Sequence, residues 1–173
     1  ISVHSCPVGS LGAKDTGGMS VYIRELAYEL GKQGHSIDVY TRVHDQADPE
    51  IIVLGQNTRL IHLRAGEEEA QKLALYSHLP DFAGNIENFR KDSGLHYDLV
   101  FSHYWLSGCV GTYLQQWWHI PQIIMFHTLG AVKNATGIGE EEAELRIVTE
   151  RELVSNCHHI IATTEREKKE LIL

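Results

Sequence analysis

Two adjacent glycines, Gly17 and Gly18, precede a segment with helical periodicity, and this pattern suits the binding of a phosphate. Glycines at the start of a helix leave backbone N–H groups uncovered, and the helix dipole adds positive potential there. The pattern matches neither G-x-G-x-x-G nor a Walker loop. In an alternative interpretation of equal weight, Asp15 or Thr16 caps the helix and the glycines only form the turn.

Three histidines, His4, His103 and His127, each follow a short apolar segment that is typical of a β-strand. A single histidine in such a place is more often a packed or capping residue. The carboxyl ends of parallel strands converge at one edge of a sheet, so three histidines together favour a functional site. No metal site is expected, because H-E-x-x-H is absent and the adjacent His158 and His159 would point to opposite faces of a strand.

Basic residues in segments that follow or flank the predicted strand ends could bind an anionic group; they are Lys72, Lys133, Arg146 and Arg151. Arginine in particular binds phosphate in a bidentate manner. The spacing of Arg146 and Arg151 from the glutamates around them favours a different interpretation, in which they form ion pairs along a solvated helix.

The composition is that of an ordinary globular protein and excludes several classes. The 173 residues contain 15 Lys and Arg against 23 Asp and Glu, a net charge of −8, which disfavours a general nucleic-acid binder. The three cysteines are widely spaced and odd in number, which argues against a disulfide framework and predicts a reducing, cytoplasmic location. No apolar stretch approaches the ~20 residues that span a bilayer, so no transmembrane segment is expected.

The hydrophobic pattern alternates between strand-like and helix-like segments. We predict helices over residues 17–32, 67–79, 81–91, 105–118 and 140–157, with a last helix that Thr164 caps, and a loop over 128–139. We predict strands over residues 36–42, 51–54, 58–63, 98–102, 122–126 and 159–163. Continuously apolar strands between helices predict an α/β fold, a Rossmann-like, mostly parallel sheet with helices on both faces. No linker is visible, so one domain over residues 1–173 is expected.

Several motifs, in order, resemble the N-terminal half of retaining GT-B glycosyltransferases of family 4. Residues 17–22, followed by Leu26, Leu30 and Gly34-His35, resemble the family's G-G-x-x-x-Y/H…L…L…G-H element. Residues 102–108 and 127–134 are similar to the subgroup that holds sucrose-phosphate synthases and D-inositol 3-phosphate glycosyltransferases, and residues 146–151 and 160–164 continue the likeness.

The resemblance implies roles for individual residues. Gly17 and Gly18 would bind the diphosphate of a nucleotide-sugar donor, with Gly18 stabilising the leaving group, and His127 falls at the active-site histidine near the donor sugar. The acceptor-binding positions that the resemblance implies are Ser20, Lys72, Tyr104, Thr128 and Arg146. For Arg146, this role replaces the interpretation as a residue that only forms ion pairs along a helix. Ser20 stands where the inositol-phosphate enzymes carry Asn, so the identity of the acceptor stays open. No metal or other cofactor is implied, since the nucleotide diphosphate sugar is a co-substrate.

The resemblance also implies that the chain is one part of an enzyme. It begins without Met and ends inside a predicted helix, and the family's C-terminal nucleotide-sugar-binding domain is absent from it, so we expect these residues alone to be inactive. Such an enzyme would transfer a sugar from a nucleotide diphosphate sugar to a phosphorylated polyol or sugar. The alternatives are a sucrose-phosphate synthase-like enzyme and a non-catalytic phosphate-binding module; a nicotinamide-dependent enzyme is less favoured because G-x-G-x-x-G is lacking. A homodimer stays open as the assembly.

Overall fold

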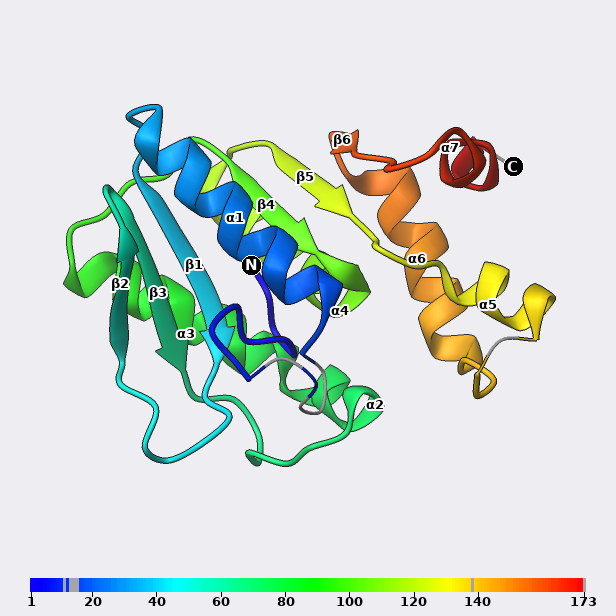
Figure 1. Ribbon diagram of the computed structural model, residues 1–173, viewed down its shortest axis with the longest axis horizontal. Helices are drawn as coiled ribbons and strands as arrows, with labels where there is room; N and C mark the ends of the chain where they lie inside the picture. The colour runs from blue at the N-terminus through cyan, green and yellow to red at the C-terminus, as the bar shows by residue number, and fades with distance from the viewer. Residues whose placement is uncertain (11, 13–15, 138, 173) are drawn as a thin grey trace. The chain divides into compact units, whose positions relative to one another are not determined.

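The chain forms two compact units, residues 1–96 and 97–173. This computed structural model describes residues 1–10, 12, 16–137 and 139–172, and the element order runs through both units (Figure 1). Asp15, one of the two predicted helix caps, lies outside the described residues. The expected single domain over residues 1–173 stays a prediction.

The first unit contains a three-stranded sheet in the order β1-β3-β2. Strands β1 (Ile37–Arg42) and β3 (Thr58–Leu63) are parallel, with Ile37 opposite Thr58, while β2 (Ile51–Gly55) pairs with β3 in the antiparallel direction. Its helices are α1 (Gly18–Lys32), α2 (Lys72–Leu75) with the short 3₁₀ helix η1 (Tyr76–His78), and α3 (Leu79–Asp92).

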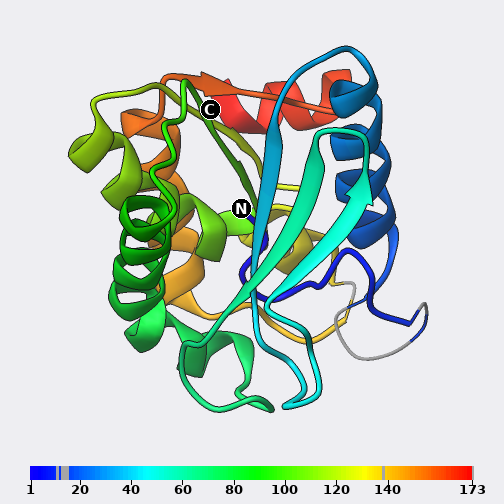
Figure 2. The same ribbon diagram turned by 90° about the vertical axis from the view of Figure 1, so that its left-hand side faces the viewer.

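Helices α1 and α3 cover opposite faces of this sheet (Figure 2). Successive residues of a strand point to opposite faces, and the packing follows that period. Val39 and Leu60 belong to the apolar cluster that includes Ile23 of α1. Tyr40, the next residue of β1, meets Phe89 of α3 edge to face at 5.9 Å between ring centroids. The predicted covering of both faces is confirmed for this sheet.

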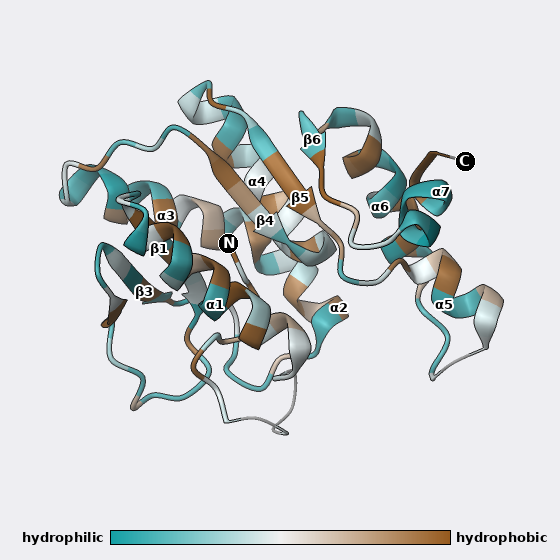
Figure 3. Ribbon diagram, turned by 45° about the horizontal axis from the view of Figure 1, so that its top comes forward, coloured by the Kyte–Doolittle hydropathy of each residue, from teal (hydrophilic) through white to brown (hydrophobic). Residues whose placement is uncertain are grey.

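The second unit contains a parallel sheet in the order β4-β5-β6, with His103 of β4 opposite Met125 of β5. Its strands are β4 (Val100–His103), β5 (Gln122–Met125) and β6 (His159–Ile160), and hydrophobic residues form most of β5 and the first half of β4 (Figure 3). Its helices are α4 (Tyr104–Trp118), α5 (Gly130–Thr136), α6 (Glu144–Asn156) and α7 (Glu165–Ile172).

Helix α4 packs against β4 and β5 at glycine positions. A Cβ on Gly111 would collide with the side chains of Gln122 and Ser102, so only glycine lets the helix approach this closely. The buried Gln122 amide donates to Ser102 Oγ at 3.1 Å and to the carbonyl of Gly108 at 2.8 Å, which satisfies polar groups under the helix.

The predicted α/β fold is confirmed, since three of the four described strand pairs are parallel. The predicted cap of the last helix is also confirmed, because the Glu167 N–H donates to Thr164 Oγ1 at 3.0 Å. The helix predicted over 67–79 was too long, since α2 and η1 cover only residues 72–78. The predicted loop over 128–139 was wrong, because it contains α5. In the described part of the chain, no helix is long and apolar enough to cross a membrane.

Candidate functional site

The ends of β4 and β5 carry two residues with left-handed backbone conformations. Tyr104, directly after β4, has φ 76°, and His127, two residues after β5, has φ 63°. Residues other than glycine rarely adopt positive φ, and such conformations gather at functional sites where the surrounding structure imposes them. Two of the residues that the sequence resemblance placed in the site therefore share an unusual backbone conformation at neighbouring strand ends.

The histidines at these two strand ends are hydrogen-bonded to each other. His103 Nδ1 lies 3.0 Å from His127 Nε2, and His103 is only 4% exposed. Burial lowers the pKa of His103 well below its ordinary value, with a further contribution from His127, and burial also lowers the pKa of His127. Two neutral rings joined through these atoms must share one tautomer: either both carry hydrogen on Nδ1 or both carry it on Nε2.

The expected convergence of histidines is thus found for His103 and His127. His4 is buried in the first unit and is described only there. Its approach to the other two histidines stays a prediction.

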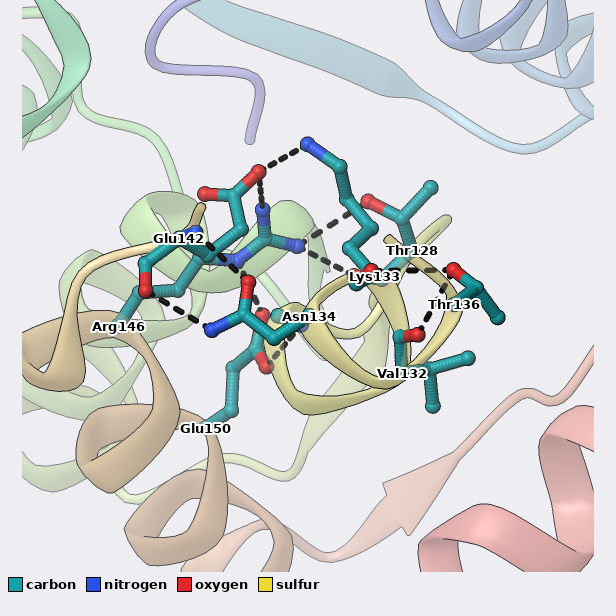
Figure 4. A network of polar contacts seen from close by, with 9 residues as sticks. Thr128, Val132, Lys133, Asn134, Thr136, Glu142, Arg146 and Glu150 are labelled. Atoms are coloured by element: carbon teal, nitrogen blue, oxygen red, sulfur yellow. Dashed lines mark hydrogen bonds and ion pairs between the residues drawn. The ribbon is translucent and has the colours of Figure 1, made fainter. Parts of the chain in front are cut away.

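Arg146 of α6 is the centre of a polar network in the second unit (Figure 4). Its side chain is 2% exposed, and every guanidinium nitrogen has a partner. Nε donates to Glu150 Oε1 at 2.7 Å, and Nη1 lies 2.9 Å from Glu142 Oε1. Nη2 donates to the Thr128 carbonyl at 2.7 Å and to Thr128 Oγ1 at 3.1 Å. The arginine thereby joins α6 to the segment that follows β5.

Tyr104 completes the surroundings of the guanidinium. The carbon Cζ of Arg146 lies 4.6 Å from the centroid of the Tyr104 ring, a cation–π contact. Burial works against the charge of Arg146, but its neighbours Glu150, Tyr104 and Glu142 together outweigh burial and raise the pKa of the guanidinium. The structure therefore brings together three residues predicted to bind the acceptor: Tyr104, Thr128 and Arg146.

Two glutamates neutralise Arg146 from different sides. Glu150 is 5% exposed in its side chain and also accepts the Gly130 N–H at 2.8 Å, at the start of α5. Glu142 is 20% exposed and pairs with Lys133 of α5 as well as with Arg146. The prediction that Arg146 forms ion pairs with neighbouring glutamates was right about the partners, but the helix face is buried rather than solvated.

Gly17 and Gly18 form the glycine loop at the start of α1, and no described side chain or backbone packs against the position of their missing Cβ atoms. A Cβ on Gly17 or on Gly18 would meet no described atom within 4 Å, and neither residue has positive φ. No side chain caps α1, so Thr16 does not act as the cap, and the Gly17 N–H donates to Ser20 Oγ at 3.4 Å. Packing and backbone geometry in the described chain thus give no reason for glycine at these positions, whereas a ligand that approaches the backbone closely would.

The remaining predicted acceptor residues lie in the first unit. The hydroxyl of Ser20 is buried, with the residue 1% exposed, and hydrogen-bonds Ser5 Oγ at 2.6 Å, so in this structure it supports the glycine loop. Lys72 is the half-buried first residue of α2. Their roles toward an acceptor stay predictions.

Sequence reasoning missed the parts of the site that long-range packing creates. The glutamates around Arg146 were predicted only as its partners on a solvated helix, and Lys133 was named only as one of several basic residues near the strand ends, without a role toward the acceptor. The signal for both glutamates was their i,i+4 spacing from Arg146, whereas nothing in the local pattern marks Lys133 as a second partner of Glu142. Within the described ranges no group of three or more His, Cys, Asp or Glu side chains could hold a metal ion.

The parallel strands with polar residues at their carboxyl ends define a Rossmann-like α/β fold, and the second unit carries a cluster of ion pairs around the buried Arg146. The fold matches one half of a GT-B glycosyltransferase: sucrose-phosphate synthase from Thermosynechococcus elongatus superimposes with a TM-score of 0.89 at 29% identity, over 99% of this chain and 44% of that one.

The chain belongs to the family described as "Glycosyl transferase 4-like domain", which matches residues 17–173. It is similar to the D-inositol 3-phosphate glycosyltransferases of Corynebacterium efficiens, at 38% identity, and Corynebacterium glutamicum, at 40%. Each match covers 99% of this chain but only 41% and 42% of those two proteins. The chain thus spans about two fifths of the length of these relatives, and the predicted resemblance to family 4 glycosyltransferases is confirmed.

Proposed function

We propose that this chain is the acceptor-side domain of a retaining glycosyltransferase that moves a sugar from a nucleotide diphosphate sugar to a phosphorylated polyol or sugar. The observation that carries the proposal is the meeting of Tyr104 and Thr128 around the Arg146 guanidinium in a chain of this family. A buried guanidinium beside the Thr128 hydroxyl is chemistry that suits a phosphate group. The names of the inositol-phosphate relatives agree with an acceptor of this class.

In the proposed reaction, the bond from the sugar's anomeric carbon to the donor diphosphate breaks. An acceptor hydroxyl oxygen bonds to that carbon on the same face, and its proton passes to the departing diphosphate, so the anomeric configuration is kept. The N–H groups at Gly17 and Gly18 would stabilise the charge that develops on the diphosphate, because preorganised donors act where charge appears. His127 would contact the donor sugar. Neither a metal ion nor another cofactor enters this scheme.

The proposal also includes a second domain that holds the nucleotide, a cytoplasmic location and, as an open question, a homodimer. A sucrose-phosphate synthase-like reaction is the second candidate, favoured by the structural match to that enzyme. The first candidate takes a phosphorylated polyol or sugar, of which inositol phosphate is the example in the relatives' names, and the second takes a hexose phosphate specifically.

The test is a screen of the full-length enzyme with nucleotide diphosphate sugars and these two acceptor classes. Lys72→Ala should raise the acceptor KM while leaving the donor KM unchanged, and Lys91→Ala is the matched control because Lys91 is an exposed lysine of the same unit. Transfer to neither class would refute the proposed function, and equal acceptor KM values in both variants would remove Lys72 from the acceptor site.

A further inference from the structure

The carboxylate of Glu142 occupies the position where two cations of the second unit converge. Glu142 Oε1 pairs with Lys133 Nζ and lies 2.9 Å from Arg146 Nη1 (Figure 4). The same guanidinium contacts Thr128 and the Tyr104 ring. One negative oxygen therefore sits on the arginine that the proposed function assigns to the acceptor phosphate.

The two glutamates on Arg146 differ in how firmly they are held. Glu150 lies on the same helix, is 5% exposed and also accepts the Gly130 N–H, so its removal would leave buried groups unpaired. Glu142 precedes α6, is 20% exposed, and its other partner, Lys133, is 34% exposed. Solvent therefore reaches the Glu142 side chain more readily than the Glu150 side chain, while the Arg146 side chain between them is 2% exposed.

The charges of the cluster also favour an exchange of the Glu142 carboxylate for a phosphate. Arg146 and Lys133 carry two positive charges, and Glu142 and Glu150 carry two negative ones, so the cluster as it stands is neutral. A phosphate monoester carries about −1.5 to −2 charges at neutral pH and would be repelled by the Glu142 carboxylate. Once that carboxylate moves away, the two cations outnumber Glu150 and the cluster attracts the dianion.

We propose that Glu142 is an internal stand-in for the acceptor phosphate, which displaces the Glu142 carboxylate and takes Lys133 as its second cation. This inference rests on the proposed function, because it takes the incoming group to be the acceptor's phosphate. It adds Lys133 to the acceptor site and makes Glu142 a competitor that sets acceptor affinity.

The backbone around Glu142 is held independently of its carboxylate. The Asn134 amide donates to the Glu142 carbonyl at 3.1 Å, and the Glu142 N–H donates to Asn134 Oδ1 at 2.7 Å. The side chain can therefore rotate out, or be neutralised by substitution, while Asn134 keeps the segment against α5. We therefore expect Glu142→Gln to remove the negative charge without changing the backbone of this segment.

Titration of the 173-residue chain with inorganic phosphate, followed by calorimetry, tests the inference directly. Glu142→Gln should bind phosphate more tightly, on the order of tenfold, because a charge-assisted competitor is lost. Lys133→Met should bind it more weakly by a similar factor. Glu141→Gln is the matched control, since Glu141 is the exposed neighbouring glutamate, and it should bind like the unsubstituted chain.

The outcomes separate this inference from the proposed function. Phosphate binding that is equal or weaker in Glu142→Gln, with binding to the unsubstituted chain intact, overturns the stand-in role but leaves the acceptor site in place. Absence of phosphate binding in every variant overturns both. Tighter phosphate binding by Glu142→Gln, together with a lower acceptor KM in the full-length enzyme, supports both the inference and the proposed function. As a control, a urea unfolding curve for Lys133→Met shows whether its lower phosphate affinity results from a damaged fold.

Discussion

Replacing Arg146 with Met should destabilise the chain strongly, although methionine fills much of the same volume. The substitution removes the cation that neutralises Glu150, a carboxylate 5% exposed in its side chain, and leaves the Thr128 carbonyl without the donor at 2.7 Å. Removal of one partner from a buried ion pair costs about 3–5 kcal/mol. Domains have about 5–15 kcal/mol of stability in total, so this single change would remove a large share of it.

The double variant Arg146→Met with Glu150→Gln distinguishes the free-energy cost of the unpaired Glu150 charge from the cost of lost packing. Glutamine keeps an oxygen for the Gly130 N–H but carries no charge, so the double variant should recover ~2 kcal/mol or more of the loss. Arg151→Met is the control, because Arg151 is an exposed arginine of the same helix, and it should change stability by less than ~0.5 kcal/mol.

Urea unfolding, followed by circular dichroism, measures all four proteins. The reasoning fails if Arg146→Met costs no more than Arg151→Met, or if the double variant is less stable than Arg146→Met alone. The same result governs how activity data are interpreted: loss of transfer in an Arg146 variant reports on acceptor binding only where the fold has been shown to persist.

Three further predictions concern packing and the histidine pair. Gly111→Ala should destabilise by about 1–3 kcal/mol in urea unfolding, because its Cβ would collide with buried side chains, whereas Gly84→Ala, inside α3 with open space around it, should stabilise by about 0.5–1 kcal/mol. Nitrogen-15 NMR of the imidazoles should show the same tautomer for His103 and His127, and opposite tautomers would contradict their hydrogen bond. Because both folded-state pKa values lie below the ordinary value of 6.5, the unfolded chain binds more protons below that pH. Stability should therefore fall as the pH drops below about 6.5, by at most ~1.4 kcal/mol per pH unit for each histidine, and His103→Asn should flatten that fall.

The strand ends could be predicted from sequence because their cause is local. Continuous apolar runs form buried parallel strands, and such strands place the residues after them at one edge, as His103 and His127 confirm. The sequence pattern does not determine the hydrogen bond between these rings, because His127 lies beyond β5 with a left-handed backbone, φ 63°, that an apolar run does not predict.

Helix α5 could not be predicted because its cause is not local. Residues 130–136 are too few to show helical periodicity, and short helices are marginal on their own. Glu150 accepts the N–H of Gly130 at its start, and Asn134 is tied to the backbone of Glu142. The helix therefore exists where the side chains of the site hold it, which links the fold of this segment to the chemistry of the cluster.

The difference between local and non-local causes also explains the mixed outcome for Arg146. Residue spacing predicted its ion-pair partner correctly but predicted its exposure to solvent wrongly. The i,i+4 relation to Glu150 is a property of the helix and appears in the sequence, whereas the 2% exposure of Arg146 is a property of the packed unit. Burial changes the consequence of the pair, because a guanidinium out of water requires a permanent counter-ion. Glu150 fills that role. The charge of Glu142 is therefore not required to keep Arg146 buried, and this leaves it free to exchange with an anion from solution.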